Sequence, residues 1–265
     1  MTEFQLEAIR DKWGLNDPWY ARYWEWISNV VTGDLGTSMS RPGMAISEMI
    51  VDAAAMTLRL NALSFAISLS IALPVGILAA VKRYSIFDYL SMFGSTLGVA
   101  IPNYWIGLMG IVIFSVQLGW LPPYGSDSWK GYILPVLVLS IEEMAALARL
   151  TRGATIEVLS QDYVTTARAK GLAQRVVVVR HVVRNALLPV ITLLGYRMAF
   201  ILSGTIVIES VFAWPGLGRL FYQSITSQDL QVVQAIVLLL TTLVVIMNIL
   251  TDLTYAFIDP RVRVR

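Results

Sequence analysis

The sequence predicts an all-α membrane protein, a polytopic bundle of transmembrane helices, and two observations support this fold class. Of the 265 residues, 56% are hydrophobic and 14% are charged, whereas soluble domains have roughly 45–50% and about 25%. Five apolar stretches reach or approach the length of about 20 residues that crosses a bilayer as a helix: 57–81, 90–118, 132–149, 187–212 and 231–257. They are continuously apolar, as in "LLLTTLVVIMNIL", and do not alternate as barrel strands do, which favours helices.

The distribution of lysine and arginine predicts the topology. Residues 82–89, 149–186 and 258–265 carry 12 of the 20 basic side chains, and residues 1–56, 119–131 and 213–230 carry 6. Because basic residues concentrate on the cytoplasmic side, we place the first set in the cytoplasm. The chain then divides into an extracytoplasmic segment, 1–56, and a transmembrane domain, 57–265.

The extracytoplasmic segment contains "WYARYWEWISNVV", Trp19 to Val31, which is predicted to be an amphipathic helix at the membrane interface. It is either an aromatic belt in contact with lipid or a docking site for an external partner. No signal peptide or apolar helix precedes this segment to explain its translocation. We therefore expect that a transmembrane helix is missing before it.

Prolines and small residues shape the predicted spans. Pro74 lies in the first span and Pro102 in the second, so kinks are expected at both. Small residues, among them "LSGT" at 202–205, allow helix backbones to approach closely. A bundle of several helices around a pathway fits this pattern better than isolated anchors do.

A long basic segment, about 150–186, separates the third and fourth predicted spans. Within it, "SQDYVTTARAKGL" predicts a short helix that starts at Ser160 or Asp162 and stops at Gly171, followed by a second basic helical run that leads to Pro189. A projecting helix–glycine–helix element suits a groove on another protein. A basic loop attracted to anionic lipid fits the same composition, and spacing alone leaves both alternatives open.

"DYVTTARAKG" followed by "RHVVRNALLP" resembles the coupling segment of ABC importer permeases, specifically their oligopeptide, dipeptide and nickel branch. In the family pattern Glu-Ala-Ala is followed by three residues and a glycine. Thr165-Thr166-Ala167 stand at the first three positions and Gly171 fits, whereas Leu188-Pro189 arrive later than in the general pattern. Four other stretches resemble the branch's outer segments and closing helix in the right order: "WGLNDPWYARYWEWISNVVTGDLGTSM", "LGWLPPYG", "VFAWPGLGRL" and "NILTDLTYAFIDPRVR". The family normally has an additional, sixth helix at the N-terminus.

The resemblance implies an ABC type I importer permease fold in the inner membrane of a bacterium, and a transport subunit rather than an enzyme. It implies half of a path for small peptides, with a second homologous permease, two ATP-binding subunits, an extracytoplasmic binding protein and membrane lipid as partners, and no nucleic acid. No G-x-x-x-x-G-K-[ST] loop occurs in the chain, so ATP and Mg²⁺ are expected on the partner subunits and no cofactor on this chain. The residues expected to contact the ATPase are Asp162, Tyr163, Thr166, Ala167, Arg168, Ala169, Lys170 and Gly171.

Charged residues inside the predicted spans are candidates for the translocation path, because burying a charge in a membrane is costly. They are Glu142, Glu143, Arg197, Glu209 and Asp252. A path with acidic and basic groups suits a zwitterionic peptide, but structural ion pairs would look the same in the sequence. The stretch with Trp214, Pro215, Gly216 and Gly218 is predicted not to be regular helix and to form a folded outer loop that faces the binding protein.

Other functions are less compatible with the sequence. A nickel-chelate or glutathione importer of the same branch is the main alternative. The chain has no cysteine and one histidine, His181, which argues against a soft metal site and leaves only oxygen ligands or a chelate for a transported metal. An ion channel would not need the basic segment, and an intramembrane enzyme would need a catalytic pair that the predicted spans lack.

Overall fold

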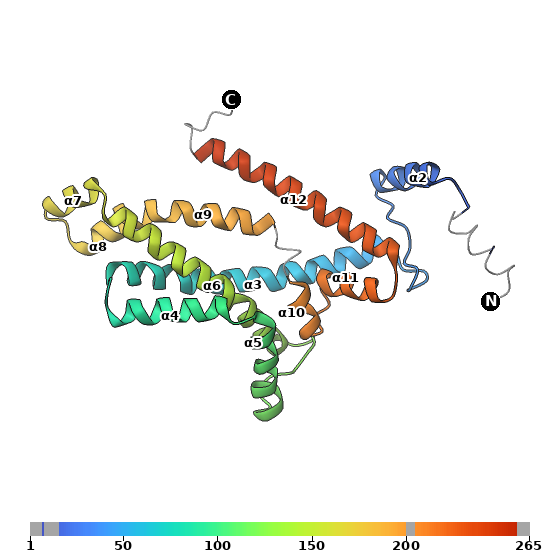
Figure 1. The fold of residues 1–265 in the computed structure, drawn as a ribbon, viewed down its shortest axis with the longest axis horizontal. Coiled ribbons are helices and arrows are strands. Elements are labelled where there is room, and N and C mark those ends of the chain that lie inside the picture. The colour runs from blue at the N-terminus through green and yellow to red at the C-terminus, as the bar shows by residue number, and fades with distance from the viewer. Residues whose placement is uncertain (1–6, 8–15, 200–204, 259–265) are drawn as a thin grey trace.

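The computed structural model describes residue 7, residues 16–199 and residues 205–258, and these form an elongated helical bundle (Figure 1). The predicted all-α fold is confirmed. The helices are α2 (Trp19–Val31), α3 (Ile46–Val81), α4 (Ile86–Ala100), α5 (Asn103–Gly110), the π-helix η1 (Ile111–Gln117), α6 (Trp129–Leu159), α7 (Asp162–Ala169), α8 (Gln174–Val176), the π-helix η2 (Val177–Val183), α9 (Arg184–Ala199), α10 (Ile206–Val211), α11 (Leu217–Thr226) and α12 (Leu230–Ile258).

Within the described residues, three helical runs are long and apolar enough to cross a membrane: α3, the run from Gln174 to Gly195, and α12 from Leu230 to Leu250. The pair of α4 with α5–η1 makes a fourth candidate if it counts as one span, bent by 94°. The predicted span 132–149 lies inside α6. The predicted span 187–212 overlaps the run Gln174–Gly195, which begins earlier than expected. Residues 200–204 of that predicted span lie outside the described residues, and α10 begins at Ile206. The first turns of the run from Gln174 carry Arg175, Arg180 and Arg184, so they were assigned to the basic cytoplasmic segment and not to a membrane span.

The two predicted kinks have different outcomes. Pro102 does interrupt the second predicted span, since α4 ends at Ala100 and α5 begins at Asn103. Ile101 has the extended backbone, ψ 126°, that a following proline favours. Pro74 instead lies inside α3, which continues as one helix of 36 residues.

The helices α3 and α6 pack in parallel and with a constant register. The hydroxyl of Ser64 donates to the carbonyl of Val136 at 3.0 Å, and that of Ser68 donates to the carbonyl of Ser140 at 3.1 Å, each pair 72 positions apart. Gly76 lies against Ala148 and Thr151, so closely that a Cβ at Gly76 would be 2.7 Å from the Ala148 carbonyl oxygen. Small residues thus allow the two backbones to approach along most of their shared length.

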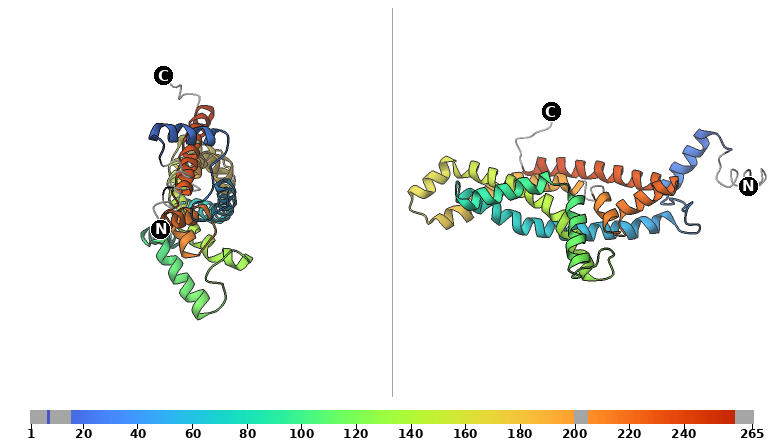
Figure 2. Two further views of the ribbon diagram at one scale, coloured as in Figure 1. Left: turned by 90° about the vertical axis from the view of Figure 1, so that its right-hand side faces the viewer. Right: turned by 60° about the horizontal axis from the view of Figure 1, so that its bottom comes forward.

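The elements gather at two ends of the bundle. The α3–α4 turn lies at the same end as α7 and α8, while α2 and α11 lie towards the other end (Figures 1 and 2). At that second end, the first turns of α3 pack against α11 and α12 in a core that includes Ile46, Ile50, Leu217 and Val232. The basic segments 82–89 and 149–186, predicted to lie on one side of a membrane, therefore meet at one end of the molecule.

Candidate functional site

The first candidate site is α7, which projects from the end of the bundle (Figure 1). The helix begins at Asp162 and is closed by amide hydrogen bonds from Lys170 to the Thr166 carbonyl and from Gly171 to the Arg168 carbonyl. Gly171 has a φ of +76°, a left-handed conformation that glycine adopts without steric cost. The predicted short helix with a glycine stop is confirmed.

The inner face of α7 packs on its own segment. Val164 is fully buried and Ala167 is 7% exposed, against Val177 and Val182 of η2 and the end of α6. Ala167, one of the residues expected at the partner contact, packs on η2. Its small side chain permits that close packing.

The outer face of α7 is polar and open to the surroundings. Tyr163 is 43% exposed and its hydroxyl accepts a hydrogen bond from Asn185 at 2.9 Å. The other predicted contact residues with exposed side chains are Asp162, Thr166, Arg168, Ala169 and Lys170. This face therefore combines two basic groups, one acid and an aromatic ring on a short rigid helix.

The second candidate site is the charged interior of the bundle. Arg197 of α9 donates to the carboxylate of Glu143 on α6 at 2.5 Å, and Asn103, the first residue of α5, donates to Glu142 at 3.2 Å. All four side chains are half-buried. The structure thus brings three of the predicted path residues to neighbouring places on α6 and α9. Asp252 lies in the last turns of α12, outside the residues whose side chains are described.

Glu209 lies apart from this group and is fully buried. Its carboxylate accepts hydrogen bonds from the hydroxyls of Thr57 at 2.6 Å and Thr205 at 2.7 Å, and from the amide of Arg219 at 3.0 Å. Arg219 is in the first turn of α11, where the helix dipole favours a negative charge. The carboxylate therefore caps α11 and ties it to α3 and α10.

The predicted outer loop is compact. Trp214 is fully buried, donates from Nε1 to the carbonyl of Met56 at 3.2 Å and meets the ring of Tyr132 edge-to-face at 4.5 Å, whereas Pro215 is exposed. The irregular part ends at Gly216, so the prediction of a non-helical Gly218 was wrong. Gly218 lies in the first turn of α11, and the close approach of α10 explains why this helical residue is a glycine: a Cβ would be 2.6 Å from the Cα of Ile206.

Two polar clusters were not found by sequence reasoning. Arg152 pairs with Asp88 at the α7 end of the bundle. At the other end, Asp229 accepts hydrogen bonds from Ser38 and Ser40. Asp229 directly precedes α12, which is a recognisable helix-start signal, but nothing local indicates its partners.

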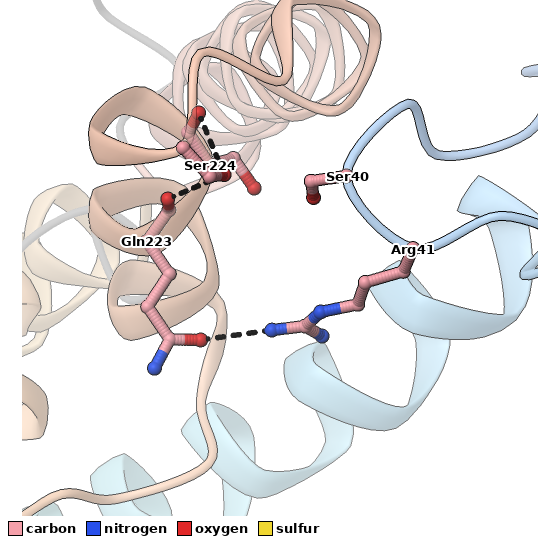
Figure 3. A pocket seen from close by; sticks show the side chains of 5 residues that line it. Ser40, Arg41, Gln223 and Ser224 are labelled. Carbon is pink, nitrogen blue, oxygen red and sulfur yellow. Dashed lines mark hydrogen bonds between the residues drawn. The ribbon is translucent and has the colours of Figure 1, made fainter.

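A polar pocket of about 280 Å³ lies beside the Asp229 cluster, lined by Ser40, Arg41, Gln223, Ser224 and Ser227. Figure 3 shows the guanidinium of Arg41 pointing across it to Gln223, with which it makes a hydrogen bond of 3.1 Å. In the part of the chain that the structure describes, no three His, Asp or Glu side chains come together as a metal site.

The comparisons with known proteins agree on one family. Residues 72–264 match the family described as "Binding-protein-dependent transport system inner membrane component". The chain is 42% identical over 272 residues to the "Oligopeptide transport system permease protein AppB" of Bacillus subtilis (strain 168), which covers 99% of this chain and 86% of that protein. It is 43% identical over 260 residues to the "Glutathione transport system permease protein GsiC" of Escherichia coli O6:H1, which covers 97% of this chain and 84% of that protein.

Two solved structures have a similar fold. A structure described as "Inward facing conformations of the MetNI methionine ABC transporter" has a TM-score of 0.65 at 20% identity, over 80% of this chain and 96% of that one. An "amino acid ABC transporter with histidines" has a TM-score of 0.59 at 18% identity, over 78% and 93%. At these identities the likeness concerns the fold alone.

Proposed function

The chain belongs to the family of inner-membrane components of binding-protein-dependent transport systems, and from this premise we propose that it forms half of an ATP-driven import path for small peptides. It is a permease subunit and not an enzyme. In this proposal a second homologous permease completes the path, two separate ATP-binding subunits hold ATP and Mg²⁺, and an extracytoplasmic binding protein delivers the substrate.

The observation that carries the proposal is that α7 has one packed face and one exposed face. Its apolar face is held by η2 and the end of α6, so the helix is rigid, while its polar face has no cover within the described residues. A short exposed helix of this kind fits a groove on a partner protein. We propose that the ATP-binding subunit contacts Tyr163, Arg168 and Lys170, with Asp162, Thr166 and Ala169 beside them. Ala167 and Gly171 serve this contact indirectly, by fixing the position of α7 and its turn.

The basic segments support an orientation in which the α7 end faces the cytoplasm. Residues 82–89 and 149–186 meet at that end and hold nine of the basic side chains, as the positive-inside rule requires of a cytoplasmic face. The α2 and α11 end then faces outwards, towards the binding protein. The aromatic side chains of α2, with Trp19 and Trp24 more than half exposed, suit the outer membrane interface.

The charged interior supports a zwitterionic substrate. Glu143 and Arg197 form an ion pair, and Glu142 is held by the neutral Asn103. Neighbouring opposite charges provide partners for the ammonium and the carboxylate of a peptide. We therefore propose that Glu142, Glu143 and Arg197 line the path. Glu209 and Asp252 are secondary candidates. Alternating access would follow when closure of the ATP-binding subunits moves α7 and the helices attached to it.

Glutathione is the second candidate substrate. The relative named as a glutathione permease matches this chain as well as the oligopeptide permease does. A glutathione molecule carries the same ammonium and carboxylate groups as a peptide. A nickel chelate is the third candidate, because a chelated metal needs no ligands from the protein and the described residues offer no metal site.

Two experiments test the proposal. The chain is purified in detergent from its native host, and the copurifying chains are identified by mass spectrometry; P-loop ATPases and a second permease are expected. The double variant R168E/K170E should lose the ATPase subunits, whereas R175E, at another exposed basic position outside α7, should retain them. Uptake of a labelled dipeptide and of labelled glutathione by cells with and without the gene separates the two substrates. Purification of the chain without any ATPase would refute the proposal and favour a channel.

A further inference from the structure

An ion pair joins α4 to α6 close to α7. Arg152 on α6 donates to both carboxylate oxygens of Asp88 on α4, from Nε at 2.5 Å and from Nη2 at 2.8 Å. The amide of Tyr84 also donates to this carboxylate at 3.0 Å. The side chain of Asp88 is 3% exposed and that of Arg152 is 24% exposed, so the pair is largely shielded from water. Two parallel hydrogen bonds from one guanidinium fix direction as well as distance.

Asp88 is itself held rigidly by the turn in which it lies. The hydroxyl of Ser85 accepts a hydrogen bond from the Asp88 amide at 3.3 Å and caps α4. Because Asp88 binds the backbone of Tyr84 on one side and Arg152 on the other, the α3–α4 turn cannot shift against α6 without breaking the pair.

The ion pair lies at the end of the α3–α6 contact. Thr151, the residue before Arg152, touches Gly76 of α3, where a Cβ would be 2.7 Å from the Cβ of Thr151. The hydrogen bonds of Ser64 and Ser68 hold the same two helices further along. From Arg152, α6 continues only to Leu159 before α7 begins at Asp162. The last two turns of α6 therefore connect α7 to a part of the bundle that is fixed from two directions.

We infer that Asp88 and Arg152 are positioning residues for energy coupling: they make α7, α6, α3 and the start of α4 move as one rigid unit when the ATP-binding subunits act on α7. This inference rests on the proposed contact between α7 and an ATPase. Without the pair, the last turns of α6 would bend at the contact, and movement of α7 would not reach the interior of the bundle. A lysine at position 152 would keep the charge but lose the two parallel bonds.

Distance measurements between spin labels test this directly, because the chain has no cysteine of its own. One label is placed at the exposed Glu157 near the end of α6 and a second at the exposed Tyr89 on α4, and the intact importer is measured without nucleotide and with ATP and vanadate. The distance between the labels is expected to change by no more than about 2 Å, the size of shifts at packed helix interfaces. A comparison pair, Glu157 with Val245 on α12, is expected to change by more. The inference is contradicted if the first pair changes as much as the second, or if neither changes.

Variants then assign the effect to the ion pair. In R152K and in D88N the Glu157–Tyr89 distance should change with nucleotide. The control is R149K, at an exposed arginine one turn earlier on α6. An R152K variant with a constant distance would show that the pair is not needed. The label distances without these substitutions test the inference even if a variant does not fold. Copurification of the ATPase, checked in each sample, separates failure of this inference from failure of the proposed function.

Discussion

Replacing Asp229 by asparagine is expected to release the loop 32–45 from the start of α12. The Asp229 carboxylate accepts hydrogen bonds from the Ser38 hydroxyl at 2.5 Å, the Ser40 amide at 3.0 Å and the Ser40 hydroxyl at 2.8 Å. Burial opposes its ionisation, but these donors outweigh burial and hold the pKa of Asp229 at about 2, below the ordinary 3.8. This difference corresponds to roughly 2 to 3 kcal/mol at 1.36 kcal/mol per pKa unit. Asparagine resembles the neutral acid, so D229N should lose about this much.

Hydrogen exchange of the purified chain in detergent measures the effect. The amides of Ser38 and Ile46 are bonded within the loop, to the carbonyls of Met44 and Gly36. They should exchange roughly 50-fold faster in D229N if the loop opens separately from the rest of the fold. The control is D52N, at an exposed aspartate of α3, which should exchange at the native rate. Equal exchange in D229N and D52N would refute the reasoning.

The same prediction has a pH dependence of known sign. Because the pKa of Asp229 is lower in the folded chain than in the unfolded chain, its stabilisation is complete well above pH 4 and is lost as the pH falls from about 4 to about 2. The difference between D229N and the native chain should shrink to about half near pH 3. A difference that stays constant between pH 7 and pH 3 would show that the charge of Asp229 is not its cause.

Three further substitutions test the packing. G171A should lower stability by about 1 kcal/mol, because its φ of +76° disfavours a side chain, whereas G153A, in open space on α6, should stabilise by a similar amount; thermal unfolding measures both. G216A should destabilise by about 2 kcal/mol or more, since its Cβ would overlap the carboxylate of Glu209; an unchanged melting temperature would place that carboxylate elsewhere. S68A should cost about 1 kcal/mol by removing one hydrogen bond to α6, and a neutral result would mean that this hydrogen bond does not stabilise the α3–α6 contact.

Local patterns were sufficient to predict two helices from the sequence. The aromatic helix at Trp19–Val31 and the helix at Asp162–Ala169 have the predicted bounds to within two residues. Pro18 directly precedes the first helix, and a glycine with positive φ follows each helix within two residues. The length of α3 was underestimated. Its first turns, from Ile46 to Met56, carry Glu48 and Asp52, so the predicted membrane span began only after them, although Ile46 and Ile50 are buried in the same helix.

Contacts between distant residues could not be predicted. The Asp88–Arg152 pair joins residues 64 positions apart, and Asp229 meets Ser38 across 191 positions. Sequence periodicity indicates which face of a helix is buried, but it does not indicate which distant residue a side chain contacts. The intramembrane charges were predicted as a group, yet only the fold shows that Glu143 meets Arg197 while Glu209 caps a helix.

The hydrogen bond between Thr57 and Glu209 has a consequence for biosynthesis. The two residues are 152 positions apart, so at the usual 5–20 residues per second the ribosome needs about 8–30 s to make the second after the first. During that interval the first long helix is present without the carboxylate that later binds its hydroxyl, and the cap of α11 cannot form. The end of the bundle that holds α11 therefore closes late, after most of the chain has been synthesised.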